Sequence, residues 1–204
     1  MLDQKRNSFK EFSSKIGKFF SNFPITPDQI TLSAFLFVFV AFYFLVKQNF
    51  ILTIIFFLIA GFLDFVDGAV ARYRDCSTLE GSYIDTVTDR YVEGILLFGM
   101  LFLPLPMVLL PSYAWIFLVL FGSIVTTYAK AAAKEKDLVG QELKGGLLSR
   151  GERIFLLLFS LVLAIFNFKW MVYSLIFMAI LTNFTALQRI KAALKNNLKK
   201  VKNN

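Results

Sequence analysis

Six long apolar segments constrain the fold of this chain more than any other feature. Hydrophobic residues make up 57% of its 204 residues, 25 of them are phenylalanine, and they occur in blocks rather than in short periodic stripes. A soluble domain rarely carries so much apolar sequence, whereas a transmembrane helix needs about 20 mostly apolar residues. Backbone polar groups must be paired within a lipid bilayer, so each block is expected to be helical. The sequence therefore predicts an all-α integral membrane protein.

The apolar segments define a bundle of six expected transmembrane helices. Their approximate bounds are 30–46, 50–71, 81–103, 112–133, 152–166 and 170–190. We expect one membrane domain over residues 26–190 and a basic cytoplasmic tail over 191–204. Residues 1–25 combine lysines with apolar residues at steps of three and four, which is typical of an amphipathic helix in the membrane interface. A disordered basic leader is the alternative for this segment, and no cleaved signal peptide is expected.

Basic residues predict how the six helices are oriented. With these bounds, 20 of the 22 lysines and arginines fall on one side of the membrane, and only Lys47 and Lys169 fall on the other. Basic residues are concentrated in the cytoplasmic loops of membrane proteins. We therefore expect a multi-pass protein of the cell membrane with both termini in the cytoplasm. The net charge of +8 then faces membrane lipids, and no nucleic acid partner is expected.

Four aspartates interrupt the apolar pattern where the second expected helix ends and the third begins. They are Asp64, Asp67, Asp85 and Asp89. The first pair is spaced i, i+3 and the second i, i+4, so each pair lies on one side of its helix. Two facing helices would gather four carboxylates, which stay charged together only beside cations. Oxygen ligands suit Mg²⁺ or Mn²⁺, and two such cations could stabilise a diphosphate during phosphoryl transfer.

Neighbouring residues in this stretch are also suited to a diphosphate. Gly68 and Gly81 allow a ligand to approach the backbone, and Gly81 stands near an expected helix N-terminus that would offer free N–H groups to phosphate. Arg72 is placed to hold a pyrophosphate charge. Arginines neutralising the aspartates without metal would explain neither the spacing nor the glycines. A divalent-cation transporter is a distant alternative, but it predicts polar residues in the outer halves of the helices, which are almost wholly apolar.

Residues 64–89 follow the pattern D-x2-D-G-x2-A-R-x8-G-x3-D-x3-D at every fixed position. This pattern resembles the signature of the CDP-alcohol phosphotransferases, also called CDP-alcohol phosphatidyltransferases. The resemblance implies a membrane enzyme in which an acceptor hydroxyl attacks the β-phosphorus of a CDP-lipid and CMP leaves. It also implies a six-helix bundle, in many members a homodimer, with a site open to the cytoplasm and the membrane.

The resemblance further implies a role for each matching residue. Two divalent cations, Mg²⁺ or Mn²⁺, are held by Asp64, Asp67, Asp85 and Asp89. Asp89 is the proposed catalytic base. The CDP moiety is surrounded by Asp64, Asp67, Gly68, Ala71, Arg72 and Gly81.

Basic residues at the expected cytoplasmic rim are candidates for binding the acceptor. They are Lys130, Arg150, Arg153 and Arg189. Arginine binds phosphate through two parallel hydrogen bonds and lysine binds it as a point charge, so these residues suit a phosphorylated acceptor. Alternatively, they are ordinary cytoplasmic basic residues of a membrane protein.

Their surrounding motifs carry a second resemblance. The segment from Thr127 to Glu135, the R-x-x-R of residues 150–153 and Gln188-Arg189 resemble the phosphatidylinositol phosphate synthase branch and its archaeal counterpart. The resemblance implies inositol 1-phosphate as the acceptor, with its phosphate bound by Thr127, Lys130, Arg150 and Arg189. Glycerol 3-phosphate, serine, or inositol phosphate with CDP-inositol as donor stay open as alternatives. The sequence does not distinguish CDP-archaeol from CDP-diacylglycerol.

Overall fold

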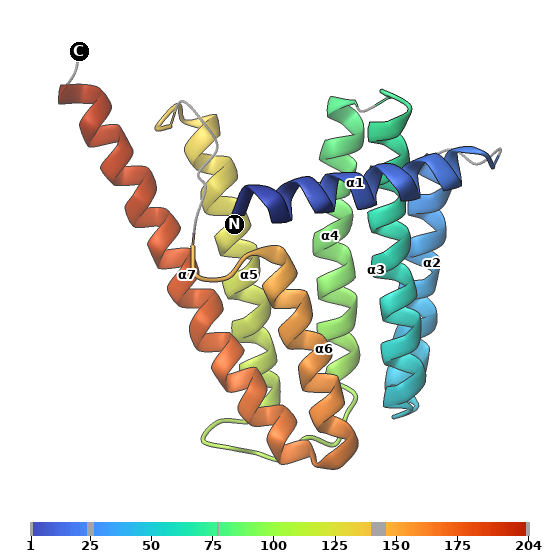
Figure 1. Cartoon of the computed structure of the whole chain (residues 1–204). Coiled ribbons are helices and arrows are strands. Elements are labelled where there is room, and N and C mark those ends of the chain that lie inside the picture. Colours follow the sequence, from blue (N-terminus) through green and yellow to red (C-terminus); the bar gives the residue numbers. More distant parts are fainter. Residues whose placement is uncertain (1, 24–26, 77, 140–145, 203–204) are drawn as a thin grey trace. The chain divides into compact units, whose positions relative to one another are not determined.

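The computed structural model describes residues 2–23, 27–76, 78–139 and 146–202. Within these ranges the chain forms seven α-helices and no β-strand, which confirms the predicted all-α class. The helices are α1 (Leu2–Ser21), α2 (Pro27–Val46), α3 (Phe50–Tyr73), α4 (Leu79–Met100), α5 (Ser112–Glu135), α6 (Arg150–Phe166) and α7 (Phe168–Lys202) (Figure 1).

Four helices in the described part of the chain are long and apolar enough to cross a membrane. The corresponding segments are Gln29–Val46, Phe50–Tyr73, Ser112–Glu135 and Phe168–Asn196. The other two expected spans differ for separate reasons: α6 has only 17 residues, and α4 carries the charged residues that follow Leu79. The described residues therefore contain four candidate membrane-spanning helices, and the count of six stays a prediction.

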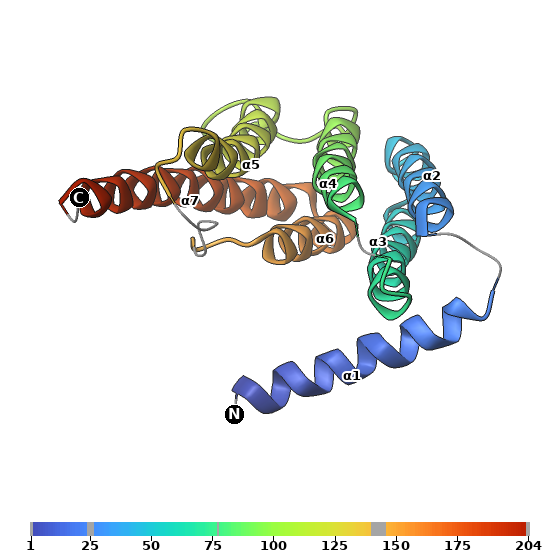
Figure 2. The same ribbon diagram turned by 90° about the horizontal axis from the view of Figure 1, so that it is seen from above.

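The chain divides into two compact units, Met1–Gly99 and Met100–Asn204. In the first unit, α2 and α3 are antiparallel neighbours, and α1 runs across α3 (Figures 1 and 2). The turn between α2 and α3 is fixed by Asn49, whose side-chain oxygen accepts a hydrogen bond from the Leu52 N–H at 3.2 Å and so caps α3. Phe56 of α3 stacks on Phe44 of α2, with ring centroids 5.4 Å apart.

Helix α1 is attached to α3 by one side of its second half. The side chains of Ile16 and Phe20 pack, with Leu63, against a buried cluster of Ile30, Val66 and Val70. Lys15 and Lys18 of α1 are exposed. Residues 2–21 of this segment are thus helical and contact the protein through Ile16 and Phe20, and the place of the helix in the membrane interface stays a prediction.

In the second unit, α7 is the longest helix and contacts both α5 and α6 (Figure 2). The hydroxyl groups of Ser160 on α6 and Ser174 on α7 are 2.6 Å apart and buried. We expected residues 167–169 to join these helices, but only Asn167 separates them, because its side-chain oxygen accepts the Lys169 N–H at 2.8 Å and starts α7 at once. Helix α7 also continues beyond Ile190, where the apolar pattern ends.

Candidate active site

The aspartate motif spans the end of α3, a short connection and the start of α4. Asp64 and Asp67 lie near the end of α3, and Asp85 and Asp89 lie in the first half of α4. The Thr78 hydroxyl caps α4 by accepting the Gly81 N–H at 2.9 Å. The N–H that we expected to be available to phosphate is therefore used by the helix cap.

Three of the four motif aspartates converge. Asp64, Asp85 and Asp89 each offer a carboxylate oxygen, and these oxygens lie within 4.8 Å of one another. Such a distance between like charges is unfavourable unless a cation or protons are present. The donors are all carboxylate oxygens, which magnesium and manganese prefer. The arrangement therefore fits a hard divalent cation.

Asp67 has a different partner. Its Oδ2 accepts a hydrogen bond of 2.5 Å from the hydroxyl group of Thr31 on α2. Among the described residues, Asp67 does not belong to the group formed by the other three aspartates. Thr31 belongs to no motif identified in the sequence, and it lies 36 residues from Asp67, so no local spacing pointed to it.

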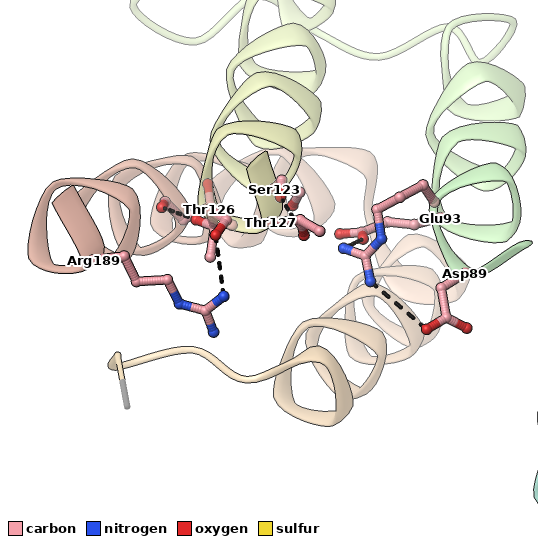
Figure 3. A network of polar contacts seen from close by, with 8 residues as sticks. Asp89, Glu93, Ser123, Thr126, Thr127 and Arg189 are labelled. Carbon is pink, nitrogen blue, oxygen red and sulfur yellow. Dashed lines mark hydrogen bonds and ion pairs between the residues drawn. The ribbon is translucent and has the colours of Figure 1, made fainter. Parts of the chain in front are cut away.

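Arg90 forms ion pairs with both Asp89 and Glu93. The Arg90 guanidinium lies 3.8 Å from the Asp89 carboxylate and 3.3 Å from the Glu93 carboxylate. Figure 3 shows Asp89 and Glu93 on the same helix, α4. Asp89 is 7% exposed and Glu93 is 2% exposed, so both carboxylates are buried, and burial favours pairing with a cation. Glu93 belongs to no motif identified in the sequence.

The residues expected to surround CDP lie on both sides of the α3–α4 connection. Gly68, Ala71 and Arg72 occupy the last turns of α3, and Arg72 is exposed. Arg72 donates a hydrogen bond from Nη2 to the hydroxyl of Ser13 on α1, at 3.1 Å. Ser13 carries no signal in the sequence, because it is 59 residues from Arg72 and resembles any serine of a polar helix face.

The residues expected to bind the acceptor all lie in the second unit. Thr127 and Lys130 are on α5, Arg150 and Arg153 are on α6, and Arg189 is on α7. The Thr127 hydroxyl donates to the Ser123 carbonyl at 3.2 Å, and Arg189 Nη1 donates to the Thr126 carbonyl at 3.1 Å (Figure 3). Arg153 is 2% exposed, and its charge acts on the half-buried guanidinium of Arg189.

The segment before α6 is held on α7 beside Arg189. The Leu147 N–H donates to Gln188 Oε1 at 3.0 Å, and the Leu148 N–H donates to Thr185 Oγ1 at 3.2 Å. Gly146 has φ of +114°, which favours glycine, and a Cβ there would lie 2.8 Å from the Thr185 side chain and 3.4 Å from Arg189 Nε. Thr185 was another residue that the motifs did not indicate.

Solved structures resemble this fold. A phosphatidylinositol phosphate synthase of Mycobacterium tuberculosis with CDP-DAG bound has a TM-score of 0.77 and 23% identity, covering 90% of this chain and 94% of that one. The same enzyme in complex with manganese and citrate also has a TM-score of 0.77, with 24% identity, covering 89% and 88%. At these identities the likeness shows the fold alone.

Sequence relatives and a family model extend over most of the chain. The archaetidylinositol phosphate synthase of Pyrococcus horikoshii is 34% identical over 197 residues, covering 96% of this chain and 97% of the relative. A bifunctional IPC transferase and DIPP synthase of Aquifex aeolicus is 31% identical, covering 91% of this chain and 42% of that longer protein. The model of the CDP-alcohol phosphatidyltransferase family matches residues 24–187. The chain therefore belongs to the CDP-alcohol phosphatidyltransferase family and is a membrane enzyme of that class.

Proposed function

We propose that the protein transfers the lipid phosphate of a CDP-lipid to inositol 1-phosphate and releases CMP. The observation that carries this proposal is the convergence of Asp64, Asp85 and Asp89 in a member of this transferase family. The acceptor is proposed from the basic residues of the second unit and from the similarity to archaetidylinositol phosphate synthase. The donor is CDP-archaeol or CDP-diacylglycerol.

The metal ligands in this proposal are Asp64, Asp67, Asp85 and Asp89, which would hold two Mg²⁺ or Mn²⁺ ions. When bound, such cations neutralise a diphosphate and stabilise the attacking and leaving oxygens of phosphoryl transfer. The oxygens of three of these aspartates, within 4.8 Å of one another, support the assignment. Thr31 orients Asp67 through their hydrogen bond, as outer partners of metal ligands do.

Asp89 is the proposed catalytic base, which accepts the proton of the attacking hydroxyl. Its burial at 7% exposure and its neighbour Arg90 hold it in one orientation, which favours proton transfer in a fixed geometry. The nucleotide is bound by Gly68, Ala71, Arg72 and Gly81 together with Asp64 and Asp67. Arg72 presents several N–H donors, so it can bind the diphosphate while keeping its bond to Ser13.

The acceptor phosphate is bound by Thr127, Lys130, Arg150, Arg153 and Arg189. Arg153 and Arg189 support this assignment, because two neighbouring cations, one of them buried, are stabilised by an anion placed between them. Within the same chemistry, glycerol 3-phosphate, serine, or inositol phosphate with CDP-inositol are the alternative reactants. The family assignment favours a transferase over a cation transporter.

The proposed topology has six transmembrane helices, α2 to α7, in residues 26–190. Residues 1–25 form an amphipathic helix in the membrane interface, and 191–204 form a basic cytoplasmic tail. Both termini and the active site face the cytoplasm, because this side receives 20 of the 22 basic residues. The functional unit is a homodimer, as in many members of the family.

CMP release in detergent or lipid vesicles tests this function. Each donor, CDP-archaeol or CDP-diacylglycerol, is combined with inositol 1-phosphate, free inositol, glycerol 3-phosphate or serine, in Mn²⁺, Mg²⁺ or EDTA. We expect turnover with inositol 1-phosphate, loss of turnover in EDTA, and a decrease of about 100-fold or more for Asp89→Asn. The matched control is Asp75→Asn, since Asp75 is exposed, has a left-handed backbone (φ 50°) that asparagine tolerates, and occupies none of the fixed positions of the motif.

Turnover with a different acceptor would keep the aspartate chemistry and discard the inositol phosphate assignment. Full activity of Asp89→Asn would remove the proposed base. CMP release that survives EDTA would contradict the metal assignment.

A further inference from the structure

We propose that Ser13 of α1 is a positioning residue that holds Arg72 in the orientation needed for nucleotide binding. In this arrangement α1 is part of the donor site and not only a membrane contact. The inference rests on the proposed function of Arg72, and each of its structural steps lies within the first compact unit.

The first step is the close approach of α1 to α3. Gly17 faces the α3 backbone, and a Cβ at this position would lie 2.5 Å from the Ala69 carbonyl oxygen and 2.9 Å from Tyr73 Cβ. Only a residue without a side chain allows the two helices to come this near. The contact places α1 directly over the last turns of α3.

The second step is the position of Ser13, one helical turn before Gly17 and on the same side of α1. Ser13 is 7% exposed, although serine on a helix surface normally faces water. Its Oγ accepts the hydrogen bond from Arg72 Nη2 at 3.1 Å. A buried hydroxyl group thus holds the end of an exposed arginine.

The third step is the contact of the other guanidinium nitrogen, Arg72 Nη1, with Gly68. A Cβ on Gly68 would lie 3.1 Å from Arg72 Nη1, so the arginine folds back over this glycine of the aspartate motif. Arg72 is therefore held at Nη2 by Ser13 and lies at Nη1 against Gly68. Its planar group has five N–H donors, and those not used by Ser13 are available for a diphosphate.

A second arginine fixes α1 at its end. Arg74 Nη2 donates to the Ser21 carbonyl at 2.8 Å and to the Phe23 carbonyl at 3.1 Å. Basic side chains commonly bind the last carbonyls of a helix, which have no partner within the helix. This attachment fixes the position of α1 relative to α3, and it therefore keeps Ser13 within hydrogen-bond distance of Arg72.

The expected advantage is preorganisation. A free arginine side chain has many rotamers, and a ligand must restrict them on binding, which weakens its affinity. Ser13 and Gly68 restrict Arg72 before the nucleotide arrives. The bond should therefore affect binding of the CDP part of the donor, and it should have little effect on the acceptor.

The test measures the binding of CDP in the presence of Mn²⁺ by titration calorimetry with the full chain in detergent. We expect Ser13→Ala to lower CDP affinity on the order of 3- to 10-fold, as for the loss of one typical hydrogen bond, because the arginine loses its orienting partner and keeps its charge. Ser14→Ala, a change at the exposed neighbour, should bind CDP as the unchanged protein does. In the Arg72→Gln background, adding Ser13→Ala should have no further effect.

Kinetics provide a second readout. Ser13→Ala should raise the KM for the CDP-lipid by a similar factor, with kcat and the KM for the acceptor unchanged. Ser13→Cys controls for a change in packing, because cysteine nearly keeps the side-chain volume of serine but is a weaker hydrogen-bond acceptor. It should therefore lose CDP affinity as Ser13→Ala does. A general loss of structure would instead lower kcat and the melting temperature together.

Several outcomes overturn the inference. The inference is wrong if Ser13→Ala and Ser13→Cys bind CDP as tightly as the unchanged protein does. That result would leave the proposed function intact. Independent, additive losses for Ser13→Ala and Arg72→Gln would also overturn the inference, because they would show that Ser13 does not act through Arg72. If the unchanged protein neither bound CDP nor released CMP, the proposed function itself would fail and the inference with it.

Discussion

The four motif aspartates are equivalent in the sequence pattern but have different surroundings. Asp64, Asp85 and Asp89 share one small volume, while Asp67 is bound by the hydroxyl group of Thr31. A carboxylate held by a donor has less freedom to reorient than one held only by its own rotamer preferences. We infer that Thr31 sets the direction in which Asp67 presents its second oxygen.

Removing the Thr31 hydroxyl should weaken metal binding. Thr31→Val keeps the shape of the side chain but removes the hydrogen bond to Asp67 Oδ2. Loss of an outer partner of a metal ligand typically lowers metal affinity or activity about 10- to 100-fold. We expect the Mn²⁺ concentration for half-maximal CMP release to rise by a factor in this range.

A control on the same helix is Ser33→Ala, because the exposed Ser33 hydroxyl donates to the carbonyl of Gln29 in the preceding turn and belongs to no proposed site. Its Mn²⁺ dependence should not change. An unchanged Mn²⁺ dependence of Thr31→Val would show that Asp67 needs no orienting partner.

Local spacing predicted part of the site and long-range contacts decided the rest. The i, i+4 spacing of Asp85 and Asp89 predicted that both would point to one side of a helix, and both belong to the carboxylate cluster. Thr31 and Ser13 lie 36 and 59 residues from their partners, so only the folded chain brings them together. A single threonine on an apolar helix, or a single serine on an amphipathic one, carries no period that would indicate such a partner.

Among the elements, α1 and α3 form the contact on which the proposed donor site depends. Gly17 and the α3 backbone meet without room for another carbon atom. The lysines of α1 predicted a helix at the membrane surface, but the apolar period could not distinguish a lipid-facing side from a protein-facing one. In the structure, Ile16 and Phe20 pack toward α3.

A side chain at Gly17 should separate α1 from α3. In Gly17→Ala the new Cβ meets the Ala69 carbonyl oxygen at 2.5 Å, and this backbone atom cannot turn away. Such overpacking costs about 1–3 kcal/mol. We expect a lower thermal unfolding midpoint and weaker CDP binding, both measured on the protein in detergent.

Gly61→Ala on α3 is the matched control, because a Cβ at Gly61 has no heavy atom within 4 Å. Alanine has the higher helix propensity, so this variant should be equally or slightly more stable. Equal stability and CDP affinity of Gly17→Ala and the unchanged protein would contradict the close contact.

Helix bounds were predictable where they coincide with a change in hydrophobicity. The second expected span began at Phe50, as α3 does, and the fourth began at Ser112, as α5 does. The end of α7 differed by 12 residues from the expected Ile190, because the lysines and alanines that follow are good helix formers although they are not apolar. Hydrophobicity indicates the span, whereas the helix follows backbone propensity.

At the scale of the whole molecule, the lone cysteine reports the orientation in the membrane. Cys76 is exposed and lies between the two halves of the aspartate motif. If the motif faces the cytoplasm, a membrane-impermeant maleimide should label Cys76 in inverted vesicles and not in right-side-out vesicles. Labelling is measured by the mass of the intact protein.

The Cys76→Ser variant measures labelling of groups other than Cys76. Labelling of right-side-out vesicles opened with detergent confirms that the thiol is reactive. Labelling of intact right-side-out vesicles alone would place the motif on the outer face and reverse the proposed topology.

The division at Gly99 and Met100 separates the residues that we assign to the donor from those that we assign to the acceptor. Every residue assigned to the metal ions and to CDP lies in Met1–Gly99, and every residue assigned to the acceptor lies in Met100–Asn204. Under these proposed assignments, substitutions that change the recognised alcohol are expected in the second unit, while the first keeps the residues proposed for the transfer reaction. The same assignments predict that a lineage could change its lipid headgroup without replacing the metal and nucleotide ligands.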